Sequence, residues 1–138
     1  MMWTDVLGWY RDEQDVPEVA QRFEAAGVTP AAAGRLLRAG LVGDLDAQGW
    51  AEVGPLGVAL VTAEVDRAAD VVRRRAAALR SAAIAEMAQT VTIADIARQV
   101  GQSRQAVSKA AHGERTFLAW ASDVAADAAR LIENGAAR

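Results

Sequence analysis

The chain has 138 residues and a formal net charge of -3, from 15 Lys and Arg against 18 Asp and Glu, and it contains no cysteine. The length predicts about one domain with a real core, while the acidic balance argues against an even electrostatic coating of nucleic acid. The lack of cysteine excludes disulfide bonds and thiolate metal sites, and the alanine-rich, aromatic-poor composition favours an all-α fold.

Residues 1–42 predict an acidic unit of short helices. Residues 3–14 predict a first helix, and this stretch lacks the basic start and apolar core of a secretory signal. Further helices are expected over 15–27 and 29–40, each with a capping residue, an early proline and a closing glycine. Because the unit is acidic and its third helix contains Gly34, we expect it to serve packing or to bind a protein partner.

A connection and a long helix follow. Residues 43–57 are rich in glycine and predict a connection, with Trp50 anchored to a core. The longest apolar run, over 55–63, is shorter than the roughly 20 residues that span a bilayer, so we expect no membrane contact and a cytoplasmic location. Residues 58–88 predict one long helix, or two with a bend near Ser81. Its expected apolar seam is Val61, Val65, Ala68, Val72, Ala76, Leu79 and Ala83.

Charge is distributed unevenly along the chain. Residues 1–52 hold nine acids and four arginines, whereas residues 91–115 hold two acids and four bases. The arginines of the long helix are Arg67, Arg73, Arg74, Arg75 and Arg80. They predict either a solvated face or a flank that contacts phosphate groups, with Arg73 and Arg74 as the candidate phosphate contacts.

Residues 92–113 predict two helices joined by a tight turn. Thr92 can cap the first helix and Ser103 the second, and Gly101 fits a turn position that needs positive φ. The predicted core and turn residues of this motif are Ile96, Ala97, Val100, Gly101 and Val107. Because these residues point inward, the side chains on the outer face of the second helix are not needed for packing.

That outer face carries the chemistry of a DNA reader. It holds Arg104, Gln105, Ser108 and Lys109. Arginine and lysine suit the acceptors of guanine, glutamine suits adenine, and serine bonds phosphate. The N-terminal end of a helix also offers free amides to a phosphate. The spacing therefore predicts a surface that enters the major groove.

The run T-I-x-D-I-A-x-x-x-G-x-S-x-x-x-V-S-K resembles the helix-turn-helix of the LacI-type bacterial repressors. The resemblance covers 92–114 and does not extend to that family's ligand-binding domain. The base-reading residues that it implies are Arg104, Gln105 and Lys109. The backbone-contacting residues that it implies are Thr92, Ser103, Ser108 and His112. Gln102 and Ala110 depart from the pattern, since larger apolar residues are usual there, and they leave the local core thin.

A last helix is predicted over 116–135, where Phe117 and Trp120 could fill the thin core or meet a second copy. The whole pattern predicts an all-α helical bundle, in which a tri-helical helix-turn-helix unit is joined by the long helix to an N-terminal αα unit. The predicted segments are 1–42, 43–57 and 58–138.

No pattern predicts an enzyme, a metal site or a cofactor. The single histidine, His112, ends the predicted second helix, where a cap or a phosphate neighbour fits better than a general base. The acids Asp12, Glu13 and Asp15 lack the ligand spacing and glycine of an EF-hand. No glycine-rich phosphate loop or paired metal-binding histidines occur.

We therefore expect a sequence-specific binder of double-stranded DNA, most simply a transcriptional repressor or regulator. It should act as a homodimer, because two motifs read half-sites about 34 Å apart. One alternative is a protein-interaction module, such as an antitoxin or adaptor, that binds through the acidic N-terminal unit. Another is a DNA partition or packaging protein.

Overall fold

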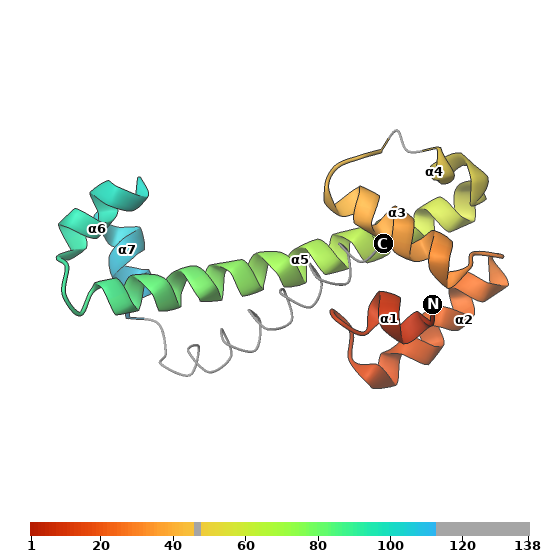
Figure 1. Cartoon of the computed structure of the whole chain (residues 1–138), viewed down its shortest axis with the longest axis horizontal. Coiled ribbons are helices and arrows are strands. Elements are labelled where there is room, and N and C mark those ends of the chain that lie inside the picture. The colour runs from red at the N-terminus through yellow and green to blue at the C-terminus, as the bar shows by residue number, and fades with distance from the viewer. Residues whose placement is uncertain (46–47, 113–138) are drawn as a thin grey trace. The chain divides into compact units, whose positions relative to one another are not determined.

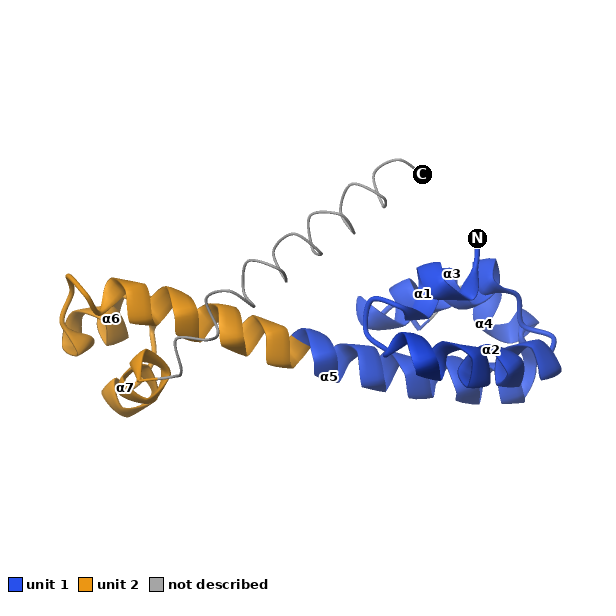
Figure 2. Cartoon of the chain, turned by 90° about the horizontal axis from the view of Figure 1, so that it is seen from below, with its two compact units in different colours: residues 1–72 blue, residues 73–138 orange. Residues whose placement is uncertain are grey.

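The computed structural model describes residues 1–45 and 48–112, and every regular element in these ranges is a helix, which confirms the all-α prediction. The chain divides into two compact units, unit 1 (Met1–Val72) and unit 2 (Arg73–Arg138), as Figure 2 shows. The boundary falls inside the long helix α5 (Gly54–Met87), whereas the sequence pointed to the connection at 43–57. The difference arises because the first turns of α5 contribute to the core of unit 1.

Unit 1 is built from short helices followed by the start of α5 (Figure 1). Its described elements before α5 are α1 (Trp3–Leu7), the 3-10 turn η1 (Glu13–Asp15), α2 (Val16–Ala25), α3 (Pro30–Leu41) and α4 (Gly49–Glu52). The predicted starts of α2 and α3 are confirmed, but the Asp15 side chain makes no capping hydrogen bond, and α3 continues past the expected closing Gly40 to Leu41. At the start of α3 the hydroxyl of Thr29 accepts a hydrogen bond from the amide of Ala32 at 3.2 Å, which satisfies an amide that has no partner within the helix.

The prediction of a first helix over 3–14 is wrong. α1 ends at Leu7, and the Gly8 amide donates to the Thr4 carbonyl at 3.0 Å. The chain then turns, and this turn still buries Leu7 and Tyr10. A turn can bury apolar side chains three residues apart as well as a helix can. Periodicity alone therefore could not distinguish a continuing helix from a turn after Leu7.

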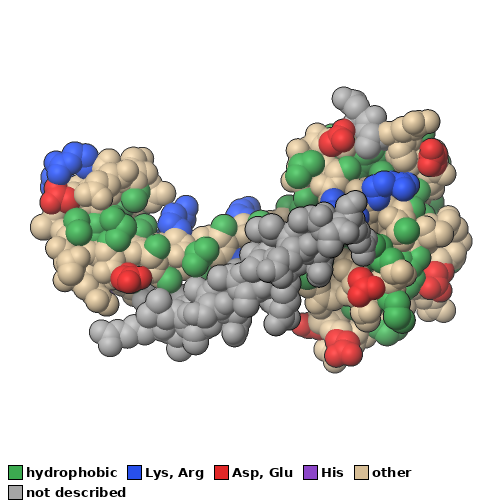
Figure 3. Space-filling model, viewed as in Figure 1, with side chains coloured by type: hydrophobic (Ala, Val, Ile, Leu, Met, Phe, Trp, Pro, Cys, Tyr) green, Lys and Arg blue, Asp and Glu red, His purple; other side chains and the backbone are tan. Residues whose placement is uncertain are grey.

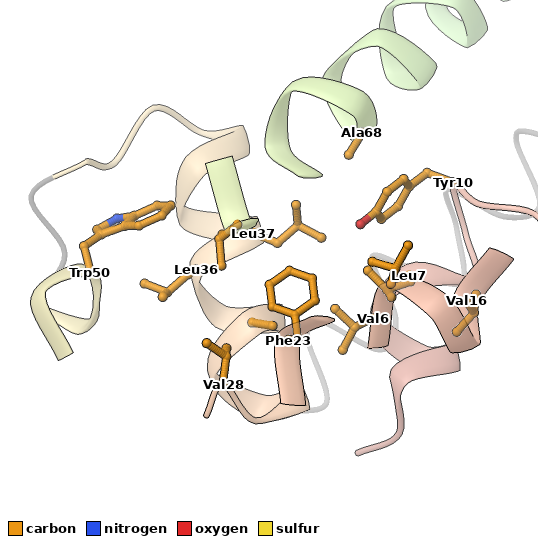
Figure 4. Packing of buried hydrophobic residues seen from close by; sticks show 13 residues of the cluster. Val6, Leu7, Tyr10, Val16, Phe23, Val28, Leu36, Leu37, Trp50 and Ala68 are labelled. Carbon is orange, nitrogen blue, oxygen red and sulfur yellow. The ribbon is translucent and has the colours of Figure 1, made fainter. Parts of the chain in front are cut away.

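The core of unit 1 gathers side chains from all of its helices (Figure 4). Trp3 stacks on Phe23 with ring centroids 5.1 Å apart. Trp50 anchors the connection as predicted, because its ring is buried and its indole N–H donates to the Asp44 carbonyl at 3.1 Å. The buried residues of this core are Val6, Leu7, Tyr10, Val16, Val19, Phe23, Val28, Ala33, Leu36, Leu37, Trp50, Val61 and Ala68.

Gly34 marks a close approach between α1 and α3. A Cβ atom at this position would lie 3.3 Å from Cγ2 of Val6, and Gly34 itself is buried. The glycine is therefore explained by packing. The middle of α3 is covered by α1, which agrees with a packing role for this helix.

A buried ion pair joins the turn after α1 to α5. Arg11 donates to the Glu64 carboxylate through Nε at 2.9 Å and through Nη2 at 2.6 Å, and the Tyr10 hydroxyl donates to the same carboxylate at 2.7 Å. Among the described residues, Glu64 is the one charged side chain that is buried. A buried carboxylate is tolerated only when it is paired and hydrogen-bonded, as here.

This Tyr10–Arg11–Glu64 cluster shifts the pKa of each member. Burial alone would raise the pKa of Glu64, but the hydrogen bonds from Arg11 and Tyr10 and the charge of Arg11 outweigh it, so the pKa is lowered. Burial, with the hydrogen bond to Glu64, raises the pKa of Tyr10. The hydrogen bonds to Glu64 raise the pKa of Arg11. The carboxylate therefore stays ionised and the phenol stays protonated in the folded unit.

α5 begins at Gly54, four residues before the predicted start, because Pro55 is compatible with the first turn of a helix. It continues as one helix past Ser81 to Met87, so no bend divides it. The predicted seam holds only at its start: Val61 and Ala68 are buried, but Val72 and Leu79 are 47% and 46% exposed. The core of unit 1 covers the first turns of α5 and leaves this later stripe uncovered.

The described part of unit 2 is formed by α6 (Ile93–Val100), α7 (Arg104–Ala111) and the end of α5, so the long helix contributes to this core as well as leading to it. Its buried core residues are Ile84, Ile96, Ala97 and Val107. Met87, Ala88, Val91, Ile93, Ala110 and Ala111 pack against them and are partly buried. The predicted helix over 116–135 and its residues Phe117 and Trp120, together with the predicted helix end at Gly113, lie outside the described residues.

Candidate nucleic-acid interface

The α6–α7 pair (Thr92–His112) begins with a capped helix. The Thr92 hydroxyl accepts a hydrogen bond from the Asp95 amide at 3.2 Å. The carboxylate of Asp95 forms an ion pair with Arg98 on the next turn. The capping hydroxyl uses its acceptor lone pair, so its own proton remains a possible donor to a phosphate oxygen.

The turn between the helices depends on Gly101. This residue adopts the left-handed conformation, with φ 69° and ψ 31°, and the Gln102 amide donates back to the Ala97 carbonyl at 3.1 Å. This six-to-one hydrogen bond is the Schellman ending of a helix, which favours glycine at the left-handed position. The predicted role of Gly101 is therefore confirmed.

We predict that Gly101→Ala lowers the free energy of unfolding of unit 2 by about 1 kcal/mol, because a Cβ is disfavoured at positive φ. A Cβ there meets no heavy atom within 4 Å, so the cost comes from the backbone alone. Gly101→Asn should lose less, since asparagine tolerates this conformation better. Urea unfolding followed by circular dichroism measures both variants, and equal losses would contradict the backbone explanation.

α7 has a buried side and an exposed side. The Ser103 hydroxyl caps the helix by accepting from the Ala106 amide at 3.1 Å, and Val107 is fully buried against the core. Gln105 lies two residues before Val107 and Lys109 two residues after it. Two residues turn a helix by about 200°, so both side chains point away from the core. Both are exposed, which agrees with the predicted outer face.

The remaining residues of this face follow from the same register. His112, which caps the C-terminal end of α7, lies seven residues after Gln105, in line with the same ridge, and is exposed. Its Nδ1 lies 2.6 Å from the Ser108 carbonyl, and because a carbonyl only accepts, this hydrogen bond requires the proton on Nδ1. Arg104 is exposed beside this ridge, whereas Ser108 is half-buried. Thr92 and Ser103 are exposed at the two helix starts.

Val100 does not belong to the core, contrary to the prediction. It is 41% exposed, although Ile96 and Ala97 on the same side of α6 are buried. Val100 is the last residue of α6, where the chain enters the turn at Gly101. The apolar stripe of α6 therefore extends one turn beyond the described side chains that cover it. Helical spacing alone could not show that Val100, at the end of this stripe, is exposed.

The structure also positions arginines outside the motif. Arg73 and Arg74 are exposed on α5, and each makes interactions within the chain. Arg73 precedes the core residue Ile84 by eleven residues, or about 16 Å of helix. Arg73 and Arg74 are thus not part of the α7 ridge, and any phosphate that they contact differs from those near Ser103.

Arg98 was missed as a candidate from the sequence. It follows the buried Ile96 by two residues, which places it on the opposite, exposed side of α6. The same reasoning that selected Gln105 and Lys109 would have found it. With Arg98 included, residues 91–112 hold three bases and one acid, a net charge of +2. Figure 3 shows Lys and Arg side chains at the α6–α7 end of unit 2.

Metal-binding groups and membrane-spanning helices are two features absent from residues 1–45 and 48–112. No group of three or more His, Cys, Asp or Glu side chains there could hold a metal ion. No helix within the same residues has the length and apolar character needed to cross a membrane.

Comparison with models of protein families, with curated proteins and with solved structures finds no match to this chain.

Proposed function

We propose that this chain binds double-stranded DNA in a sequence-specific manner and acts in the cytoplasm as a transcriptional repressor or regulator. The observation that carries the proposal is the register of α7. Val107 is fully buried, while Gln105, Lys109 and His112 form an exposed ridge on the opposite side, with Arg104 beside it. Such a helix presents long polar side chains to a major groove without disturbing its own core.

The helix starts add phosphate chemistry to this ridge. Thr92 and Ser103 cap α6 and α7 through their side chains, and both are exposed. Exposed helix N-termini and hydroxyl groups are common donors to the DNA backbone. With Arg98, Arg104 and Lys109 nearby, the local charge is positive although the chain is acidic. We infer that the acidic balance of unit 1 keeps nonspecific binding low.

The decisive experiment is selection of bound sequences from a random pool of duplexes at low salt, followed by a mass measurement of the complex. The proposal expects one enriched sequence with two-fold symmetry and two copies of the chain on it. An unchanged pool after several rounds would reject sequence-specific binding.

Gln105→Ala and Arg74→Ala should separate base reading from backbone contact. Gln105 is uncharged, so its loss should relax preference at one base pair by about 1–3 kcal/mol and leave the salt dependence unchanged. Arg74→Ala should weaken binding to all sequences alike and reduce the slope of log affinity against log salt by about 0.9. Titrations of matched and mismatched duplexes at several salt concentrations measure both effects, and identical profiles for the two variants would contradict the assignment.

A second function, as a protein-interaction module such as an antitoxin or adaptor, draws on an exposed apolar site in unit 1. Val42 and Leu45, just after α3, are 81% and 67% exposed, and Asp44 lies between them. Exposed large apolar residues next to acids fit a protein partner. Val42→Ser with Leu45→Ser should then abolish copurification of that partner and leave DNA binding intact.

A further inference from the structure

The turn between α2 and α3 in unit 1 has the same backbone geometry as the turn between α6 and α7 in unit 2. Gly27 adopts the left-handed conformation with φ 73°, close to the 69° of Gly101. The Val28 amide donates to the Phe23 carbonyl at 2.9 Å, which is the same six-to-one hydrogen bond that ends α6. Two residues after the glycine, the Thr29 hydroxyl caps α3, in the same place as the serine that caps α7. The α2–α3 pair therefore forms a second helix-turn-helix within this chain.

The second helices of the two pairs also agree in which positions are buried and which are exposed. The residue six positions after the turn glycine is buried in both, as Ala33 in α3 and as Val107 in α7. The residues four, eight and eleven positions after that glycine are exposed in both helices. In α7 these are the ridge residues Gln105, Lys109 and His112, and in α3 they form an α3 ridge of Ala31, Arg35 and Arg38.

The packing of Gly34 leaves this α3 ridge accessible. Gly34 lies about 100° around the helix from its neighbour Arg35. α1 covers the side of Gly34, where a Cβ atom would lie 3.3 Å from Cγ2 of Val6, while all three residues of the α3 ridge are exposed. The contact with α1 thus lies beside the ridge and does not cover it.

The α3 ridge is basic although unit 1 is acidic. α3 holds two arginines and no acid. Neither Arg35 nor Arg38 forms an ion pair with a residue that the structure describes. Arg35 lies beside the start of α4, where a Cβ atom on Gly49 would be 3.4 Å from its Nη2, so Arg38 is the less restricted of the two. Exposed guanidinium groups without a carboxylate partner are suited to phosphate oxygens.

We propose that the α2–α3 pair is a second DNA-binding motif, which contacts backbone phosphates through Arg35 and Arg38 and does not read bases. This proposal rests on the proposed DNA binding by the α6–α7 pair. At the position that Gln105 occupies in α7, α3 has Ala31, which offers no hydrogen bond to a base edge. Arginine contacts with phosphate hold a protein on a duplex without selecting its sequence. The two motifs therefore divide the work, with α7 selecting the site and α3 adding affinity.

The acidity of unit 1 determines when the second contact forms. Residues 1–52 hold nine acids and four arginines, so DNA repels unit 1 as a whole and the α3 ridge alone binds it weakly. Once α7 is on its site, the covalent link raises the local concentration of the α3 ridge at the same DNA. The second contact then strengthens a complex that α7 has already formed.

Charge-matched variants of the full chain test the ridge. Arg38→Gln should weaken binding to matched and mismatched duplexes alike, and should reduce the slope of log affinity against log salt by about 0.9. Arg35→Gln with Arg38→Gln should reduce this slope by about 1.8. Arg22→Gln is the control, because Arg22 is an exposed arginine of the same pair but is held by Glu18 on α2, and it should keep the native slope. Equal slopes for Arg38→Gln and Arg22→Gln would overturn the proposal.

Ethylation of individual phosphates in the selected duplex locates the contacts. The native chain should need two sets of unmodified phosphates. Arg38→Gln should lose its need for one set and keep the set that flanks the base pair at which Gln105→Ala relaxes preference. A change in no phosphate, or only in the set beside that base pair, would overturn the second motif and leave the assignment of α7 intact. Failure of the native chain to select any duplex would overturn the DNA-binding proposal as well.

Discussion

Ile96→Ala should unfold the described core of unit 2 and abolish specific DNA binding, while unit 1 stays folded. Ile96 is fully buried, and it is one of only four buried residues in this core within the described chain. Truncating a buried isoleucine to alanine costs about 2–5 kcal/mol, because apolar contacts are lost and a cavity remains. A core this small gives a low free energy of unfolding. The cost of Ile96→Ala should therefore exceed the free energy that keeps this core folded.

The tryptophans allow the two units to be followed separately. In a Trp120→Phe background, the remaining tryptophans are Trp3, Trp9 and Trp50, all in unit 1. Their emission should be unchanged by Ile96→Ala, while helical circular dichroism falls and DNA binding disappears. Ile96→Val is the matched control and should cost only about 0.5–1.5 kcal/mol. Native affinity in the alanine variant would show that this core is not needed for binding.

Local features of the α6–α7 pair could be predicted from the sequence because they depend on neighbours in the chain. The caps at Thr92 and Ser103 each need only a hydroxyl and an amide three residues later. The turn at Gly101 needs only a residue that accepts positive φ. Burial of Ile96 and Val107 followed from helical spacing. The exposure of Val100 did not, because it depends on where the covering helices end.

Features that join distant parts of the chain could not be predicted. Glu64 reads as an ordinary exposed acid of a long helix, but its partner Arg11 is 53 residues away. The early end of α1 is linked to the same contact, since the turn after Leu7 carries Tyr10 and Arg11 to that carboxylate. Periodicity defines the faces of a helix, but it does not say which face a partner covers.

The long helix illustrates this limit most clearly. Its sequence gives one continuous seam, yet Val61 and Ala68 are buried in unit 1 while Val72 and Leu79 are exposed. In unit 2, α5 instead enters the core through Ile84, on another side of the helix. The seam is thus a composite of two surfaces, of which the core of unit 1 covers the first and leaves the second exposed.

Arg11→Ala should destabilise unit 1 by about 3–5 kcal/mol, because it leaves the buried carboxylate of Glu64 without its cation. Arg11 and Glu64 are 12% and 9% exposed, so water can replace little of the lost interaction. Adding Glu64→Gln to this variant should restore part of the stability, since a neutral amide costs less to bury. Urea unfolding, followed by tryptophan emission in the Trp120→Phe background, measures all three chains. Further destabilisation by Glu64→Gln would contradict the role assigned to the charge.

The same cluster should limit the stability of unit 1 at both ends of the pH range. The folded pKa of Glu64 is lowered, so its contribution is complete above the ordinary value of about 4.3 and is lost as the pH falls through the folded pKa. The folded pKa of Tyr10 is raised, so its contribution is complete below about pH 10 and is lost as the pH rises further. Glu64→Gln should flatten the acid side of the stability profile, and Tyr10→Phe should flatten the alkaline side. If Glu64→Gln steepened the loss of stability on the acid side, or Tyr10→Phe steepened it on the alkaline side, the direction of the corresponding shift would be wrong.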